Sequence, residues 1–383
     1  MKTLLKRGMQ VLLVLLVVAV GVGIWKRDLV MRLIAVNTLF DADRIVQNFS
    51  HMDALFLTRP LPRGDGPVSP LPTGTAAVLS AEVEKWVQDR AVTGMVILKD
   101  GAVVHESYYL GTGPDDLRIS WSMAKSVLSA LFGVVLAEGQ IASLDDQVVK
   151  YAPQLVGSAY DGASIRNVLN MASGVRFNED YQDFNSDINR MGRVLALGGS
   201  MDDFAAGLTA RDAEPGTAWH YVSIDTHVIG MVIRGATGRG IAELLVEKIL
   251  QPMGLEADAY YVTDGLGEPF VLGGLNLRTR DYARIGQMIL QNGVWNGRQI
   301  VPADWVQASI TASAPGGGYG FQWWLPAGGT VGEVMAQGVY GQYIYIHQGL
   351  GVVIAVNAAD RGFEDPGVYD DTIALLRQIA AGL

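Results

Sequence analysis

A serine and a lysine three residues apart are the sharpest chemical feature of this sequence. Ser122 and Lys125 lie within SMAKSVLSALFGVVLAEG, which predicts a helix over residues 122–138. Residues i and i+3 share one helix face, so the lysine amine can reach the serine hydroxyl and take its proton. The N-terminus of a helix adds N–H donors that favour an oxyanion. The pair predicts a nucleophilic centre, although S-x-x-K alone also occurs by chance.

A tyrosine well downstream is the second candidate. Tyr221 and Ser223 form the ends of YVS, which follows PGT at residues 215–217 and precedes another expected helix. A phenol near an ammonium group can have its pKa lowered and then shuttle protons. The alternative for a single tyrosine is a core aromatic side chain with a satisfied hydroxyl. The motif alone leaves both interpretations open.

The composition excludes several other chemistries. The 383 residues contain no cysteine, which rules out disulfides, thiolate metal sites and a cysteine nucleophile. No two of the five histidines stand at i, i+4, and we expect neither a metal nor an organic cofactor. The net charge of -10, from 29 basic and 39 acidic residues, argues against nucleic acid as a partner.

The first 25 residues differ in composition from the rest. Lys2, Lys6 and Arg7 precede an uncharged run over residues 8–25. As a helix this run would be roughly 27 Å long, close to the hydrocarbon thickness of a bilayer. It predicts an N-terminal transmembrane helix in a bacterial inner membrane, with the body in the periplasm. The alternative is a cleaved signal peptide, which would release the body into the periplasm.

The other expected elements run in the order strands, helices, strands, helix. A short amphipathic helix over residues 29–48 is followed by a Pro/Gly-rich extended connector over residues 60–74. Ser80 caps the next helix, and Asp100-Gly101 is typical of a hairpin turn. Further segments follow: helices over 165–172, 204–208, 226–234 and 241–250, a hairpin over 343–356, and a helix from about 371. This order indicates one α/β unit interrupted by a helical insertion.

Taken together, the sequence resembles the serine β-lactamase and penicillin-binding-protein superfamily, in its class C and esterase-like branch. Within it, the chain is most similar to the 6-aminohexanoate-dimer hydrolase group. The resemblance covers about residues 96–380. It rests on six stretches in order: RISWSMAKSVLSALFGVVLAEGQIASLDDQVVKYAPQL, ASIRNVLNMASGVRF, PGTAWHYVSIDTHVIG, LNLRTRDYARIGQMILQNGVWNGRQIVPADWV, YGFQWW and AQGVYGQYIYI. Several stretches matching in order are far more specific than one motif.

The resemblance implies an α+β fold of the β-lactamase/transpeptidase type, an antiparallel β-sheet flanked by helices with an inserted all-helical domain. The expected division of the chain is an anchor or signal segment over 1–25, a juxtamembrane helix and Pro-rich connector over 26–75, and a hydrolase domain over 76–383, with its α/β part at about 76–150 and 265–383 and its helical part at about 151–264.

The resemblance also implies a mechanism. Ser122 would attack the carbonyl of an ester, amide or lactam, with Lys125 accepting its proton and Tyr221 relaying that proton to the leaving group. The acyl-enzyme would then be hydrolysed by water. By family position, the oxyanion would be bound by the backbone N–H groups of Ser122 and Val339, and Gly338 would let the substrate approach the third-motif strand.

The third motif departs from the superfamily pattern. It consists of Ala336, Gln337 and Gly338 in place of Lys-Thr-Gly, so a charge-assisted contact with a substrate carboxylate is lost. Ser223 keeps a hydrogen-bonding group in the second motif. These residues favour an uncharged or differently charged ester or amide, either a 6-aminohexanoate-oligomer-like amide or a carboxylic ester. The alternatives are a D,D-peptidase or weak β-lactamase acting on cell-wall-related substrates, and a catalytically idle peptidoglycan-binding or sensory module.

A polar loop before the second motif supplies the last candidates. Tyr181, Asp183, Asp187 and Asn189 stand where the aminohexanoate-hydrolase relatives have an aromatic residue and an acid that contact the scissile amide and the substrate amine. Tyr181 and Asp187 are therefore the predicted substrate contacts in this loop. The alternative is a solvated loop with ordinary turn chemistry.

Overall fold

Two antiparallel sheets and a block of helices form the computed structural model, which describes residues 2–383 except the side chains of residues 2–5, 11, 17–19 and 22. The larger sheet has the order β3-β2-β11-β10-β9. Its strands are β2 (Val92–Lys99), β3 (Ala102–Tyr108), β9 (Glu333–Gly338), β10 (Gln342–His347) and β11 (Val352–Ala358). The smaller sheet has the order β1-β5-β6-β4. Its strands are β1 (Thr58–Leu61), β4 (Arg118–Ile119), β5 (Ala259–Val262) and β6 (Leu275–Leu277), and β7 (Val294–Trp295) pairs with β8 (Arg298–Gln299).

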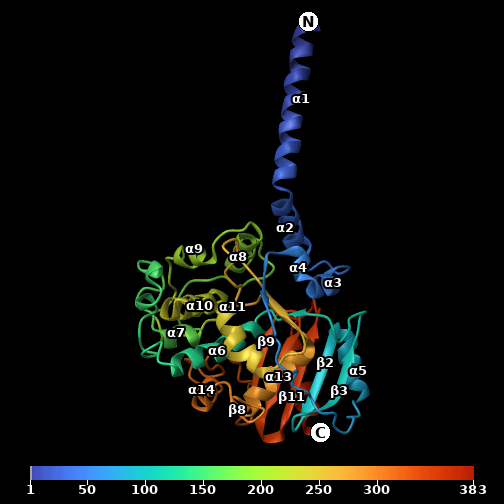
Figure 1. The fold of residues 1–383 in the computed structure, drawn as a ribbon, viewed down its shortest axis with the longest axis vertical. Helices are drawn as coiled ribbons and strands as arrows, with labels where there is room; N and C mark the ends of the chain where they lie inside the picture. The colour runs from blue at the N-terminus through green and yellow to red at the C-terminus, as the bar shows by residue number, and fades with distance from the viewer. Residues whose placement is uncertain (1) are drawn as a thin grey trace.

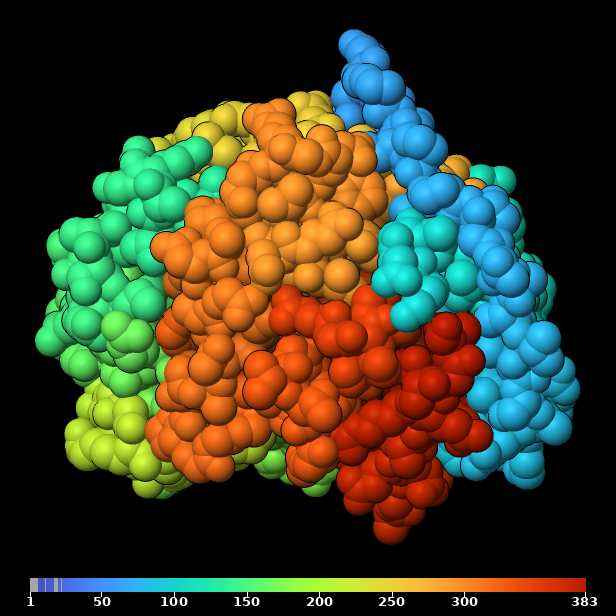
Figure 2. Space-filling view, turned by 90° about the horizontal axis from the view of Figure 1, so that it is seen from below, coloured from blue at the N-terminus to red at the C-terminus, as the bar shows by residue number. Residues whose placement is uncertain are grey.

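Helices cover both faces of the larger sheet. Met95 and Ile97 of β2 pack with α5 (Ala81–Asp89) and α15 (Val368–Ala381). Val96 and Leu98 point the other way, into the main core with α13 (Thr279–Leu290), because side chains alternate along a strand. Strand β2 pairs with β11, so the early, light-blue part of the chain and its late, red part lie side by side although they are far apart in sequence (Figure 2). The predicted α+β arrangement of an antiparallel sheet flanked by helices is confirmed.

Local signals placed several elements correctly. The Ser80 hydroxyl accepts the Val83 N–H at 3.4 Å and caps α5. Asp100 and Gly101 both have positive φ, +50° and +83°, as a tight turn between β2 and β3 requires. The second predicted hairpin is the antiparallel pair β10 and β11, with Tyr343 opposite Val356.

The helices between β4 and β5 form the block beside the sheets (Figure 1). They are α6 (Met123–Ala137), α7 (Ile165–Leu169), α8 (Asp187–Ala196), α9 (Met201–Ala206), α10 (Ser223–Thr237), α11 (Ile241–Leu245) and α12 (Gln251–Met253), with short turns η1 (Val148–Lys150) and η2 (Pro153–Leu155) and a π-helical turn η3 (Val246–Leu250). Outside the block lie α14 (Ala303–Ser309) and η4 (Gln348–Leu350).

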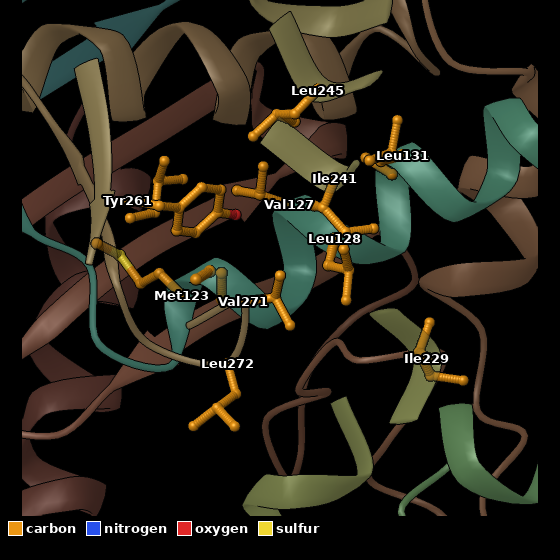
Figure 3. Packing of buried hydrophobic residues seen from close by; sticks show 14 of the residues in the cluster. Met123, Val127, Leu128, Leu131, Ile229, Ile241, Leu245, Tyr261, Val271 and Leu272 are labelled. Atoms are coloured by element: carbon orange, nitrogen blue, oxygen red, sulfur yellow. The ribbon is translucent and has the colours of Figure 1, made fainter. Parts of the chain in front are cut away.

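The central helix of the molecule is α6. Val127 and Leu131 pack among Ile229 of α10 and Ile241 and Leu245 of α11 (Figure 3). Nearly every residue of α6 is buried, which explains why its sequence is apolar on all sides. The surrounding core therefore fixes the N-terminus of α6, the end that carries the predicted nucleophile.

The N-terminal segment packs on the body after α1 (Lys2–Trp25), which projects away from it (Figure 1). The segment contains α2 (Arg27–Thr38), α3 (Ile45–Ser50) and α4 (Met52–Leu55), so the single helix expected over residues 29–48 is interrupted. Part of the expected connector is strand β1, in which Pro60 pairs with Tyr260 of β5. Proline is tolerated there because β1 is an edge strand.

Within the residues that the structure describes, no helix is both long and apolar enough to cross a membrane. The predicted transmembrane helix over residues 8–25 is therefore not supported. The side chains of residues 11, 17–19 and 22 in that run lie outside the described residues.

Candidate active site

Ser122 lies at the sharp turn between β4 and α6. Trp121, directly before it, has φ +41°, a left-handed conformation that costs a non-glycine residue on the order of 1–3 kcal/mol. Ser122 is the N-cap residue of α6 but makes no side-chain capping bond. Its Oγ instead accepts a 2.7 Å hydrogen bond from Lys125 Nζ. The predicted serine and lysine are in direct contact.

Lys125 is almost completely buried, with 1% of its surface exposed. Besides Ser122, its Nζ contacts Leu272 O at 3.1 Å and Ser223 Oγ at 3.3 Å. Burial lowers the pKa of Lys125 to about 7, against the opposing effect of nearby carboxylates, Glu179 first among them. Near pH 7 the Lys125 amine is therefore neutral in about half of the protein molecules, and the neutral amine can accept the serine proton. An exposed lysine would be charged at this pH.

Tyr221 lies over the same amine. Lys125 Nζ is 5.2 Å from the centroid of the Tyr221 ring, and Trp324 packs on that ring at 5.3 Å. Burial and the charge of Glu179 raise the pKa of Tyr221, while hydrogen bonding with Ser122 opposes them. The pKa of Tyr221 is therefore raised, whereas the sequence had allowed a lowering by a nearby ammonium group. The phenol is protonated and suited to donating a proton.

Glu179 is the site residue that the sequence analysis missed. One carboxylate oxygen accepts the backbone N–H of Ser223, and the other accepts the Ser223 hydroxyl at 3.2 Å and the Tyr181 hydroxyl at 3.2 Å. Burial raises the pKa of Glu179, and the charge of Lys125 opposes that effect. Its position two residues before Tyr181 was the only available signal, since several other acids surround it in the loop.

The third-motif strand lies directly against the serine turn. A Cβ on Gly338, the last residue of β9, would be 2.7 Å from Ser120 O and 2.8 Å from Ser122 N. Only glycine allows this approach without moving the strand. Val339 follows it and lines the space beside Ser122. Gln337 lines the same space, and its buried Oε1 has no hydrogen-bond partner among the described residues.

Only part of the predicted substrate loop reaches Ser122. Tyr181 lines the space beside it and bonds to Glu179. Asp187 instead begins α8, where one carboxylate oxygen accepts the Asn178 N–H at 2.9 Å and the other pairs with Arg190 at 2.8 Å. The structure does not bring Asp187 to the site, because its carboxylate is bonded to Asn178 N–H and Arg190 at the start of α8.

Two cavities meet at Ser122. The first, about 130 Å³, has mostly apolar walls, and the second, about 180 Å³, includes Glu179 and Tyr221. Asn189 lines the first cavity and Asp183 lines neither. No lysine or arginine lines either cavity in the described part of the chain. Nor do the described residues contain a group of three or more His, Asp or Glu that could hold a metal ion.

Comparison with known families agrees with this geometry. The sequence model of the beta-lactamase family matches residues 79–378. The chain belongs to the beta-lactamase family. The predicted resemblance to this superfamily of serine hydrolases is thereby confirmed.

Individual members of the beta-lactamase family extend the comparison. The 6-aminohexanoate-dimer hydrolase of Paenarthrobacter ureafaciens is 29% identical over 283 residues, which are 69% of this chain and 72% of that protein. A Bacillus anthracis structure provisionally named 6-aminohexanoate-dimer hydrolase superposes with a TM-score of 0.80 at 23% identity, over 89% of this chain and 95% of that one. A D-stereospecific amidohydrolase from Streptomyces sp. gives a TM-score of 0.57 at 18% identity, over 73% and 94%. Both structures share this fold.

Proposed function

We propose that this chain is a serine hydrolase that forms an acyl-enzyme on Ser122 and cleaves an ester or amide. One observation carries the proposal, the 2.7 Å bond from the buried Lys125 amine to the Ser122 hydroxyl. A lysine with a pKa of about 7 is a base at neutral pH, and the hydroxyl it contacts is the group that needs deprotonation.

The proposed reaction has two halves. Ser122 Oγ bonds to the substrate carbonyl carbon while its proton passes to Lys125, and the negative charge on the carbonyl oxygen is held by the N–H groups of Ser122 and Val339. The bond to the leaving group then breaks as that group takes a proton from Tyr221, which regains one from Lys125. Water next attacks the acyl-enzyme, releases the carboxylic acid and returns the proton to Ser122.

The electrostatics of the site support an uncharged substrate. The position of the superfamily's third-motif lysine is Ala336, and neither cavity is lined by a described lysine or arginine. A substrate carboxylate in either cavity would therefore meet no lysine or arginine on the described cavity walls, which is unfavourable. A carboxylic ester or amide with an uncharged acyl group therefore fits better than a D,D-peptide or a β-lactam. A 6-aminohexanoate-type amide, the substrate class in the name of the Paenarthrobacter relative, has the scissile amide but carries charged ends, so it ranks below the uncharged ester or amide.

Active-site labelling tests this proposal. A fluorophosphonate probe should label the wild type and should not label Ser122→Ala, and ester hydrolysis should fall by at least about 1,000-fold. Ser126→Ala, one turn along α6 with its hydroxyl bonded to Gln322 O, is the matched control and should be labelled. Labelling of Ser122→Ala would contradict the proposal, and no labelling of any form would favour the idle binding module.

We also propose that the body is exported to a bacterial periplasm. The support is the sequence alone, in which Lys2, Lys6 and Arg7 precede the uncharged run over residues 8–25. N-terminal sequencing after cell fractionation tests it. An intact N-terminus in the inner-membrane fraction supports an anchor, a chain that begins near residue 22 in the periplasm supports cleavage, and intact chain in the cytoplasm contradicts both.

A further inference from the structure

The two cavities that meet at Ser122 differ in chemistry. Ser122, Tyr181 and Val339 line both. The second cavity adds the carboxylate of Glu179 and the phenol of Tyr221. The first adds almost only apolar groups, among them Ile119, Ile188, Met191, Leu195, Val262 and Leu272. The two sides of a scissile bond held at Ser122 would therefore meet different surroundings.

The N-terminal segment completes the wall of the first cavity. Leu39, which follows α2, and Met52 of α4 are each only 3% exposed and line this cavity. Phe40 stacks on Tyr340 at 4.6 Å and 13°. On α2, the Arg32 side chain donates to Ala196 O at 3.0 Å and so ties the segment to α8. This part of the wall is built from residues that precede the matched family region, residues 79–378.

The position of Tyr221 decides which side of the substrate enters which cavity. Tyr221 lines the second cavity and is absent from the walls of the first. In the proposed reaction the leaving group takes its proton from Tyr221, so it must lie within reach of that hydroxyl. The leaving group therefore occupies the second cavity. The acyl group, on the other side of the carbonyl carbon, then points into the first.

We infer that the first cavity binds the acyl chain of the substrate and selects an uncharged, apolar acyl group of about four to six carbons, an inference that rests on the proposed function. A dry cavity of about 150 Å³ lined by Leu, Ile and Phe accepts a benzene molecule, and this one is about 130 Å³. An ammonium or carboxylate at the far end of the acyl chain would meet no partner of opposite charge among the described lining residues.

Two ester series test the assignment. With p-nitrophenyl esters, kcat/KM should rise about fourfold for each methylene from acetate to hexanoate, because each buried methylene adds a similar hydrophobic contribution. It should then level off or fall at decanoate, once the cavity is full. With alkyl acetates from ethyl to hexyl, where only the alcohol grows, the change should be several-fold smaller.

A cavity-filling variant tests the location. Gly192 lies on α8, lines the first cavity, and a Cβ on it would meet no heavy atom within 4 Å. Gly192→Leu adds a side chain to this wall with no obstruction at Cβ. If the first cavity binds the acyl chain, the ratio of hexanoate to acetate kcat/KM should fall at least tenfold. Gly113→Leu is the matched control, since Gly113 lines neither cavity and its Cβ is equally unobstructed.

The outcomes separate the two proposals. A flat acyl series, a steep alcohol series, or an unchanged ratio in Gly192→Leu would each overturn the acyl assignment while Ser122 still labels with fluorophosphonate. Absence of both labelling and hydrolysis would overturn the proposed function and the assignment with it. A steep acyl series that Gly192→Leu flattens and Gly113→Leu preserves supports both.

Discussion

Replacing Glu179 by glutamine tests whether Lys125 is the base. Ser223 Oγ lies 3.3 Å from Lys125 Nζ and 3.2 Å from Glu179 Oε2, so amine and carboxylate are at most about 6.5 Å apart. The carboxylate charge favours the protonated amine and raises the pKa of Lys125 against the effect of burial. In Glu179→Gln the charge is lost, but an oxygen that accepts the Ser223 N–H is kept.

The size of the effect follows from Coulomb's law. Unit charges about 6.5 Å apart interact by about 2.5 kcal/mol at an effective dielectric constant of about 20, which corresponds to about two pH units. In the wild type, kcat/KM should fall as the pH drops below the Lys125 pKa of about 7, since only the neutral amine accepts a proton. In Glu179→Gln that midpoint should move toward about pH 5. At pH 6 the wild type would keep about a tenth of its plateau and the variant most of it.

A pH-stat assay on an alkyl ester between pH 4.5 and 9 measures the two midpoints. Glu106→Gln is the matched control, because Glu106 pairs with Arg280 and lines neither cavity. An unmoved midpoint in Glu179→Gln, an equal movement in Glu106→Gln, or a wild-type midpoint above pH 9 would refute the assignment of Lys125 as the base.

Two further substitutions test the proton donor and the oxyanion site. Tyr221→Phe should lower kcat on alkyl esters and amides by about 100- to 10,000-fold, and much less on p-nitrophenyl esters, whose leaving group departs without a proton. Equal losses on all three substrates would argue against Tyr221 as the donor. Gly338→Ala places a Cβ against Ser120 O and Ser122 N, backbone atoms that cannot rotate away. It should lower kcat/KM by about 100- to 1,000-fold with an unchanged circular dichroism spectrum, and a loss below threefold would contradict the proposed oxyanion geometry.

The sequence predicted what depends on local geometry. The i, i+3 spacing of Ser122 and Lys125 sufficed to predict their contact, since both belong to one helix. The cap at Ser80 and the turn at Asp100-Gly101 were equally local. The division of the chain over residues 76–383 stays a prediction.

The choice between acids in the substrate loop needed the tertiary structure. Asp187 and Glu179 lie eight residues apart in a polar loop without helical or strand periodicity. The local sequence does not show that the Asp187 carboxylate accepts the Asn178 N–H at the start of α8, or that the Glu179 carboxylate accepts the Ser223 N–H in the site. For the same reason, the sequence did not decide the direction of the Tyr221 pKa shift, since its burial depends on packing with Trp324.

The sequence by itself determined the contact between Ser122 and Lys125 and the family, because these depend on short spacings and on motifs in order. Only the tertiary structure decided how these groups behave. The pKa of Lys125 depends on burial beneath Leu272, which is 147 residues away. The apolar cavity depends on Leu39 and Met52 packing beside Ser122. Burial and cavity shape come from contacts between distant segments, and no local pattern contains them.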